Sequence, residues 1–422
     1  MTQIVQNESE NRAASDGAEY LPEPLSGRAA RSLDSTTAPQ VRPLKVLHVI
    51  DSLGLGGTEQ GVLKIMAGLS LDLFEQRICA IRNCDARLAE SAGVTSKVFV
   101  SGQNKVGFQF HVPGLLKVLR SYRPHLIHSR NWGAIEAIPA AWLARVPVIL
   151  HSEHGYEIDM LSGLPWRRRL LRRTLYSLCD SVFTVSRELR EYHRQQSWSS
   201  ARRISVIPNG VDTRRFAPDA DKRQAIRAEL FGSSEPIVVG TIGRLVPIKD
   251  QRTLLEAAKN LIERGHNLQI LLVGGGPELD NLRAFAESST SLANRVRFLG
   301  PSFEVADLLR SLDVFVLPSI SEGMSNTLLE AAASGVPCIA SNIGGNPEII
   351  EDGISGLLFP PKDTLALTHC LEQVVLRPDL RAQLGSAARQ RAVTCFSIDR
   401  MMERYTTLYL DLARKSGLYA KN

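Results

Sequence analysis

The feature that most constrains the fold of this 422-residue chain is a repeated alternation of strand-like and helix-like segments. Short apolar runs rich in valine, isoleucine and leucine recur from Leu44 onwards, and longer segments with helical spacing of their apolar residues lie between them. Such runs predict strands buried on both faces, and strands that alternate with helices predict parallel sheets covered by helices. The alternation therefore predicts an α/β fold built from doubly wound sheets.

The alternation stops once and then restarts, which divides the chain into two predicted domains. The break is a turn cluster from Pro208 to Asp212, followed by a polar, charged stretch up to Pro236. The predicted division is a first domain over 44–207, a linker region over 208–236, a second domain over 237–396 and a C-terminal helix with its tail over 397–422. In doubly wound sheets the ligand binds outside the carboxyl ends of the strands, so we expect a central cleft between the two domains.

The N-terminal segment and the composition narrow the class of protein. Residues 1–43 mix acids, arginine, serine, alanine and proline without an apolar stretch, so we expect a disordered tail and not a signal peptide. The sequence contains no run of about 20 apolar residues, which a membrane-spanning helix requires. The six cysteines lack metal-ligand spacing, which is typical of reduced residues in a cytoplasmic protein.

The net charge of +6 is concentrated in the first half of the chain, which indicates an anionic partner there. Nucleic acid is the least favoured partner, because aromatic residues make up only 6% of the chain and do not alternate with the basic ones. A membrane surface and a phosphate-bearing substrate are the alternatives that remain.

The most basic segment, residues 164–178, predicts an amphipathic helix. On a helical wheel Trp166, Leu170, Leu171 and Leu175 share one arc, and Arg168, Arg169, Arg172 and Arg173 share the other. Such a helix can lie on the anionic lipid of a membrane. A helix packed on its own domain with a solvated basic face is an equally supported interpretation.

The segment from Ser319 to Ala331 has the order strand, polar loop, helix start. Ser325 and Asn326 are good N-cap residues, and the free N–H groups and positive dipole end of the following helix suit a phosphate. Two glutamates lie eight residues apart, Glu322 in the loop and Glu330 inside the helix. A carboxylate among the apolar neighbours of Glu330 would be costly without a partner, so both glutamates are candidate site residues.

Other candidate residues follow the ends of predicted strands. Arg244 and Lys249 come after the first strand of the second domain, where two cations can neutralise a diphosphate. Glycine turns at Gly56–Gly57 and at Gly274 let a ligand approach the backbone, although both lack the third glycine of the dinucleotide fingerprint. A tight turn without a ligand is an equally supported interpretation of each. His154 ends a first-domain strand and can either hydrogen-bond a sugar hydroxyl or take a proton, and a loop histidine without a role is an equally supported interpretation.

These motifs, taken in order from Leu44 to Leu412, resemble glycosyltransferase family four. The matching features are the Gly-Gly loop after the first strand, Ile-Pro-Asn-Gly-Val-Asp at the boundary, Gly-Arg-Leu-x-x-x-Lys, and two glutamates separated by seven residues. The resemblance implies a retaining enzyme with the GT-B fold, in which two Rossmann-like domains face a central cleft and the last helix crosses back to the first domain. Within the family, the chain is most similar to transferases of bacterial exopolysaccharide assembly.

The resemblance also implies a role for each matching residue. Arg244 and Lys249 would hold the donor diphosphate, and main-chain N–H groups near Ser325, Asn326 and Thr327 would cap the phosphates. Glu322 would contact the hydroxyls of the donor sugar and Glu330 those of the ribose. His154 would lie near the sugar, and Gly56 and Gly57 would belong to a loop that closes over the donor. Apart from the resemblance, the glycine turn makes Gly274 a further candidate for binding the donor. Met324-Ser325 departs from the commoner Phe-Pro of the family, so the shape of the phosphate loop is open.

The expected activity is transfer of a sugar from a nucleotide-diphosphate sugar to a sugar or lipid-linked glycan acceptor in cell-envelope assembly. We expect no metal and no cofactor, because cations and a helix terminus already serve the leaving diphosphate. The expected location is the cytoplasm, with the inner face of the cytoplasmic membrane as a site of peripheral binding. A non-catalytic sensor of nucleotide sugars and a nucleotide-sugar epimerase on the same fold are the alternative functions.

Overall fold

The structure is a computed structural model that describes residues 42–54, 56–101, 112–156, 164–200, 203–232 and 236–418. The chain from Pro43 onwards clusters as one compact unit. The expected N-terminal tail, residues 1–43, lies outside the described residues apart from its last two positions.

The first domain is built on a seven-stranded sheet with the order β3-β2-β1-β4-β5-β6-β7. Its strands are β1 (Leu44–Leu53), β2 (Phe74–Cys84), β3 (Val98–Val100), β4 (Leu126–Arg130), β5 (Val148–Glu153), β6 (Ser181–Thr184) and β7 (Ile204–Val206). All neighbouring strands pair in parallel. The strand order reverses at β1 and β4, the arrangement that places a ligand at the carboxyl ends of these strands.

Helices cover both faces of this sheet because successive strand residues point to opposite sides. The first-domain helices are α2 (Gly57–Gly68), α3 (Ala86–Ser91), α4 (Val112–Tyr122), α5 (Ala137–Leu143), α6 (Trp166–Ser177) and α7 (Arg187–Ser197), with 3-10 turns η2 (Thr95–Lys97) and η3 (Trp132–Ala134). Leu47 of β1 packs in the cluster under α4, α5 and α6, while its neighbour Val46 packs in the cluster under α2 and the last helix of the chain.

The second domain repeats this plan with a six-stranded parallel sheet of order β10-β9-β8-β11-β12-β13. Its strands are β8 (Ile237–Ile242), β9 (Leu268–Val273), β10 (Val296–Leu299), β11 (Val314–Leu317), β12 (Cys338–Ser341) and β13 (Leu357–Phe359). Its helices are α8 (Ala220–Phe231), α9 (Gln251–Glu263), α10 (Leu279–Ser288), α11 (Val305–Ser311), α12 (Asn326–Ala333), α13 (Asn346–Ile349), α14 (Thr364–Leu376) and α15 (Pro378–Cys395), with the 3-10 turn η6 (Pro247–Lys249).

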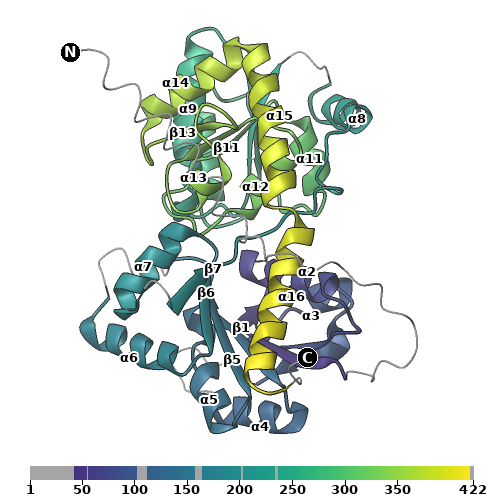
Figure 1. The fold of residues 1–422 in the computed structure, drawn as a ribbon. Helices are drawn as coiled ribbons and strands as arrows, with labels where there is room; N and C mark the ends of the chain where they lie inside the picture. Colours follow the sequence, from purple (N-terminus) through teal and green to yellow (C-terminus); the bar gives the residue numbers. More distant parts are fainter. Residues whose placement is uncertain are drawn as a thin grey trace, which may run out of the picture. The chain divides into compact units, whose positions relative to one another are not determined.

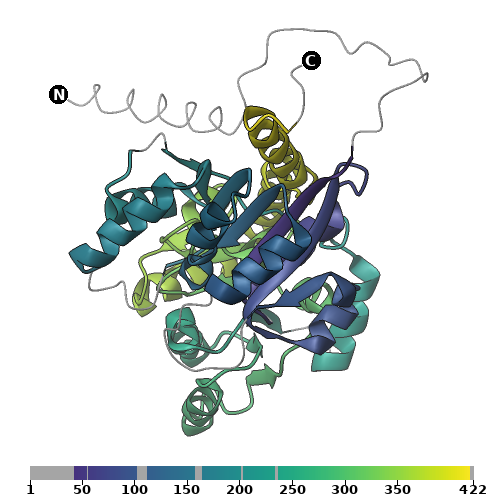
Figure 2. The ribbon, with the colours of Figure 1, turned by 90° about the horizontal axis from the view of Figure 1, so that it is seen from below.

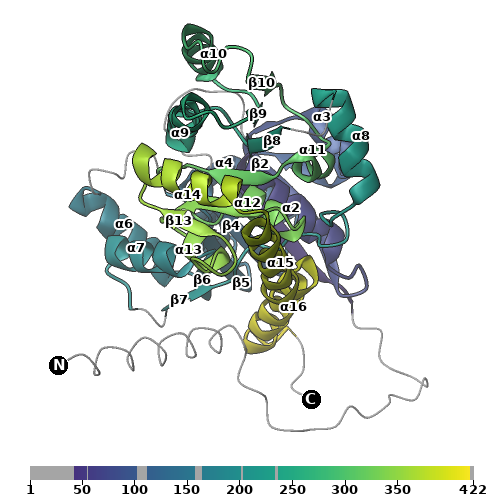
Figure 3. The ribbon, with the colours of Figure 1, turned by 90° about the horizontal axis from the view of Figure 1, so that it is seen from above.

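The two faces of the second sheet carry separate apolar clusters. One cluster lies under α9, α10 and α14, and the other lies under α11, α12 and α15. Seen from above, α9 and α14 lie side by side on one side of the sheet (Figure 3). The expectation of two doubly wound, Rossmann-like α/β domains is therefore confirmed (Figure 1).

The last helix, α16 (Ile398–Lys415), follows the second domain but packs on the first. Its residues Met401, Tyr405, Tyr409 and Leu412 are spaced by three or four positions and are all buried against the sheet face that carries Val46. Figures 1 and 2 show α16 alongside the strands of the first sheet. The expected crossing helix is confirmed.

The stretch expected as a linker contains α8, which is attached to the second domain by charged residues. Arg223 and Arg227 form salt bridges with Asp313 at 2.6 and 2.9 Å, and Arg227 also donates to the carbonyls of Ser311 and Pro236. The division of the chain at 208–236 stays a prediction. In the described part of the chain, no helix combines the length and apolar character that crossing a membrane requires.

Candidate active site

The helix start expected at Ser325 or Asn326 is confirmed, with Ser325 as the N-cap of α12. Its Oγ accepts a hydrogen bond from the N–H of Leu328 at 3.2 Å and contacts the hydroxyl of Thr327. The remaining N–H groups of the first turn therefore point out of the helix, where the positive end of its dipole favours an anion. Met324, at the departure from the family pattern, is buried, and its sulfur and carbonyl accept from the backbone and side chain of Asn209.

The structure brings Lys249 and Glu322 together, although 73 residues separate them. The Lys249 ammonium forms an ion pair with Oε1 of Glu322, and the same oxygen accepts from Ser319 Oγ at 2.7 Å. Both charged side chains are largely buried, at 20% and 10% exposure. A charge pair held at a loop with so little solvent is oriented in advance for a polar ligand.

A second glycine loop supports this segment and was missed from the sequence. Gly345, between β12 and α13, donates its N–H to the carbonyl of Gly323 at 2.9 Å. The signal was present, because Gly344-Gly345 follows a buried strand and precedes a helix with proline in its first turn. This is the same strand, glycine turn and helix order as at Gly274.

Arg244 and Gly274 belong to two turns packed on one another at the carboxyl ends of β8 and β9. A Cβ at Gly274, where φ is +138°, would lie 1.9 Å from the carbonyl oxygen of Gly243, so only glycine allows this approach. Gly274 thus supports the turn that carries Arg244. Arg244 is exposed, and its charge acts on Glu59 in the first turn of α2. Burial raises the pKa of Glu59, and both the backbone hydrogen bond of that residue and the charge of Arg244 oppose the rise.

The first domain contributes backbone and side chains to the same place. A Cβ at Gly323 would lie 2.2 Å from the carbonyl oxygen of His154, so the loop after Glu322 passes directly against the end of β5. Gly57, at the start of α2, lies against Asn326, with 3.5 Å between a Cβ built there and the amide nitrogen. Gly56 is the N-cap of α2. The residues expected at the ends of strands in both domains therefore lie at one junction.

Glu330 contacts a cation of the first domain that the sequence did not reveal. Lys64 of α2 reaches Glu330 Oε1 at 3.5 Å, and the carboxylate is only 13% exposed. Burial raises the pKa of Glu330, and the charges of Lys64 and Arg215 counteract this effect. The partner expected for a carboxylate in apolar surroundings is thus a lysine 266 residues away in sequence.

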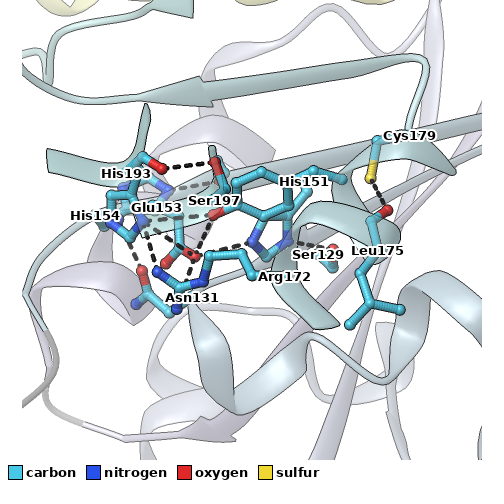
Figure 4. Close-up of polar contacts among 12 residues, drawn as sticks. Ser129, Asn131, His151, Glu153, His154, Arg172, Leu175, Cys179, His193 and Ser197 are labelled. Atoms are coloured by element: carbon cyan, nitrogen blue, oxygen red, sulfur yellow. Dashed lines mark hydrogen bonds and ion pairs between the residues drawn. The ribbon is translucent and has the colours of Figure 1, made fainter. Parts of the chain in front are cut away.

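His154 is held by its backbone and by its ring. Its N–H donates to Asn131 Oδ1 at 2.7 Å (Figure 4). Asn131 Nδ2 in turn donates to Thr58 Oγ1 at 3.1 Å, which ties the end of β5 to the first glycine loop. Its Nε2 lies 2.8 Å from Ser152 Oγ. Burial, together with the charge of Arg130, lowers the pKa of His154 to about 3, so the ring is neutral at pH 7.

A buried charged cluster lies beside this site on the opposite face of β5. Glu153 accepts from Tyr176 at 2.8 Å and lies within 3.3 Å of His151 and 3.8 Å of Arg172, all of them essentially unexposed (Figure 4). Burial alone would raise the pKa of Glu153, but the charges of His193 and Arg172 and the hydrogen bond from His151 lower it below its usual range. The cluster fixes α6 to the strand that carries His154.

The basic arc of α6 is only partly solvated, so the expectation of a solvated basic face is wrong in part: Arg173 is exposed, but the other three arginines turn toward the protein. Arg172 is fully buried, Arg168 stacks on Trp132 with 4.4 Å to the ring centroid, and Arg169 stacks on Trp198 at 4.6 Å. Trp166, Leu170 and Leu171 are instead turned outward, with 62%, 47% and 45% exposure. Leu175, the fourth residue of the apolar arc, is buried in the first-domain core, so each predicted arc is divided between protein and solvent.

Comparison with known proteins agrees with this architecture. Residues 55–215 match the model of Glycosyltransferase Family 4, and residues 222–391 match that of Glycosyl transferases group 1. The chain is 30% identical over 305 residues to the Escherichia coli UDP-Gal:alpha-D-GlcNAc-diphosphoundecaprenol alpha-1,3-galactosyltransferase, covering 71% of this chain and 78% of that protein. It is 36% identical over 264 residues to a GDP-mannose-dependent alpha-(1-6)-phosphatidylinositol monomannoside mannosyltransferase of Mycolicibacterium smegmatis, covering 60% and 68%.

Solved structures give the same result for the fold. The structure of Anabaena HepE in complex with UDP and glucose superposes with a TM-score of 0.76 at 22% identity, over 87% of this chain and all of that one. A sucrose-phosphate synthase from Thermosynechococcus elongatus superposes with a TM-score of 0.70 at 20% identity, over 88% of this chain. The two parallel-sheet domains, the matching family models and the extent of the curated similarities together identify the chain as a member of glycosyltransferase family 4 with the GT-B fold.

Proposed function

We propose that this glycosyltransferase moves a hexose, with retention of configuration and without a metal ion, from a nucleotide-diphosphate sugar to an acceptor hydroxyl in cell-envelope glycan assembly. One observation carries the proposal: Lys249 of η6 forms a buried pair with Glu322, which lies in the loop before the N-terminus of α12, and this loop passes against the backbone of His154. A cation, free N–H groups and a carboxylate are the groups that a sugar diphosphate needs.

In this proposal the protein acts by electrostatic stabilisation of the leaving group. As the sugar–diphosphate bond breaks, Lys249, Arg244 and the first turn of α12 stabilise the growing negative charge. Glu322 accepts hydrogen bonds from the sugar hydroxyls, and Glu330 accepts them from the ribose once Lys64 has been displaced. The acceptor hydroxyl attacks from the face that the diphosphate leaves and gives its proton to a phosphate oxygen.

The names of the relatives support the classes of donor and acceptor. The Escherichia coli relative is named for a UDP-galactose donor and a diphosphoundecaprenol-linked acceptor, and the mycobacterial one for GDP-mannose and a phosphatidylinositol mannoside. Both acceptors carry a lipid. We therefore propose a lipid-linked or glycan acceptor and action at the inner face of the cytoplasmic membrane.

A panel of UDP-, GDP- and ADP-sugars tests the proposed donor class in 5 mM EDTA. A donor present at 100 times its dissociation constant is expected to stabilise the protein by ~2.7 kcal/mol, which a thermal-shift assay detects. With an acceptor, the same donor should release its nucleoside diphosphate. Binding without release under any acceptor would favour the sensor, and activity that appears only after manganese is added would contradict the metal-free mechanism.

The outward side of α6 supports a peripheral membrane contact through apolar residues, and not through the basic arc expected from the sequence. Trp166, Leu170 and Leu171 form an exposed apolar surface, and the guanidinium of Arg167 lies 5.5 Å from the Trp166 ring, where it can meet an anionic headgroup. Aromatic and aliphatic side chains next to arginine suit the interface of an anionic bilayer. We propose that these three residues enter the lipid interface.

The variant Trp166→Ser/Leu170→Gln/Leu171→Gln is expected to bind vesicles of phosphatidylglycerol and phosphatidylcholine about tenfold more weakly, because it loses apolar area worth more than ~1.4 kcal/mol. Vesicle sedimentation measures the effect. The matched control is Leu365→Gln/Leu376→Gln, which removes two residues of α14 exposed at 74% and 60%. Equal sedimentation of the wild type and the triple variant would contradict the contact.

A further inference from the structure

The proton on His154 is placed by a chain of buried hydrogen bonds that begins at Arg130. Arg130 is 1% exposed, and its Nη2 lies 3.1 Å from Nδ1 of His128. A guanidinium only donates hydrogen bonds. Nδ1 of His128 must therefore carry a lone pair, and the proton of this neutral ring is on Nε2.

The next hydrogen bond in the chain joins His128 to Ser152. His128 Nε2 lies 2.8 Å from Ser152 Oγ and donates to it. Ser152 is fully buried, and among the described residues its hydroxyl contacts the rings of His128 and His154 alone. The hydroxyl proton needs an acceptor, since a buried donor without one is destabilising. The acceptor available is His154 Nε2 at 2.8 Å.

A second ring bound to Arg130 follows the same rule independently. Arg130 Nη1 lies 3.2 Å from Nδ1 of His48, which again leaves the proton on Nε2. That nitrogen lies 3.0 Å from Gln76 Oε1, an acceptor, while Gln76 Nε2 donates to the carbonyl of Met66. His48 therefore accepts at Nδ1 and donates at Nε2, which is the same proton placement as in His128.

We propose that Arg130, His128 and Ser152 form a relay that holds His154 as the neutral tautomer with its proton on Nδ1. This inference rests on the proposed function for its consequence: His154 donates a hydrogen bond from Nδ1 to an oxygen of the donor sugar and accepts no proton during transfer. The relay decides between the two roles open to this histidine, because protonation of Nε2 would leave the Ser152 hydroxyl without its acceptor.

The crossing helix takes part in the relay through Tyr409. Its hydroxyl lies 2.8 Å from Nδ1 of His128, the same nitrogen that Arg130 contacts, and the tyrosine is fully buried. A hydroxyl can donate to a lone pair, so Tyr409 and Arg130 agree in the state they require of His128. The positioning residues, which act on the sugar only through His154, are thus Arg130, His128, Ser152 and Tyr409.

The tautomer is read directly by long-range 1H–15N correlation spectra of the full chain labelled with 15N-histidine, recorded at pH 7.5 without donor. The His154 signals are assigned by their loss in His154→Gln. The expected spectrum has a protonated Nδ1 and an unprotonated Nε2. Ser152→Ala should convert it to an averaged or Nε2-protonated spectrum and lower kcat/KM for the donor about tenfold, while Ser152→Thr, which keeps the hydroxyl, should restore both.

Ser129→Ala is the matched control. Ser129 is buried on the neighbouring strand and contacts His151 Nδ1 at 2.8 Å, so it is the same kind of pair on the other face of the sheet. It should leave the His154 spectrum unchanged. Protonated Nε2 in the wild type, or a Ser152→Ala spectrum equal to that of the wild type, would overturn the relay. The wild-type spectrum needs no variant to fold, and it is independent of whether the protein transfers sugar.

Discussion

Lys249→Ala is expected to lower kcat for sugar transfer by about 10²–10³-fold, because the leaving diphosphate loses a preorganised cation worth roughly 3–4 kcal/mol in the transition state. The effect is large because the Lys249 ammonium is only 20% exposed, so little solvent screens its charge from the leaving diphosphate. Steady-state release of nucleoside diphosphate measures it.

Two variants separate this effect from a general loss of charge. Lys259→Ala removes a lysine of α9 that is 38% exposed and pairs with Glu263 at 3.7 Å, and it should transfer sugar at the wild-type rate. Glu322→Ala should lose transfer as Lys249→Ala does, because it removes the proposed contact with the sugar and the group that orients the lysine. Turnover of Lys249→Ala within threefold of wild type, with unchanged circular dichroism, would remove Lys249 from the site.

Arg172→Met is expected to lower the free energy of unfolding by about 3–5 kcal/mol, since removing one partner of a buried charge pair leaves the other charge without compensation. The remaining charge is Glu153, which is 1% exposed and whose pKa the charge of Arg172 helps to lower against the effect of burial. Urea unfolding followed by tryptophan fluorescence measures the change.

The control for this prediction lies on the same helix. Arg167 is exposed and stacks on the exposed Trp166, so Arg167→Met should change the free energy of unfolding by less than ~0.5 kcal/mol. Equal midpoints for Arg172→Met and Arg167→Met would contradict the assignment of Arg172 to the buried cluster. Membrane binding cannot be tested with a variant that removes Arg172, because such a variant changes the stability of the fold and not the lipid-facing side of α6.

Local sequence signals predicted much of the fold and the helix start at Ser325. Buried strands and helical spacing depend on neighbouring residues, and so does the cap at Ser325, so these features were visible in the sequence. The crossing helix was predicted from the family resemblance alone. Its buried apolar residues, from Met401 to Leu412, pack on first-domain residues that are distant in sequence.

The features that sequence reasoning missed depend on contacts between distant residues. The wheel of α6 shows which residues share an arc but not which of them face the domain. Trp132, Trp198 and Glu153 are the contacts that turn three of the arginines toward it. In the same way α8 looked like a polar linker because Arg223 and Arg227, not an apolar stripe, attach it to Asp313. Neither the Lys64–Glu330 contact nor the Arg130 relay has a local pattern to reveal it.

The most direct test of the central claim, that the Ser319–Ala331 segment binds the donor, is a crystal structure with a nucleoside diphosphate bound. We expect phosphate density at the N–H groups of Asn326 and Thr327, with Lys249 in contact with the phosphates and Glu330 hydrogen-bonded to the ribose hydroxyls. Diphosphate density away from the start of α12, with Lys249 and Glu322 still paired to one another, would contradict it.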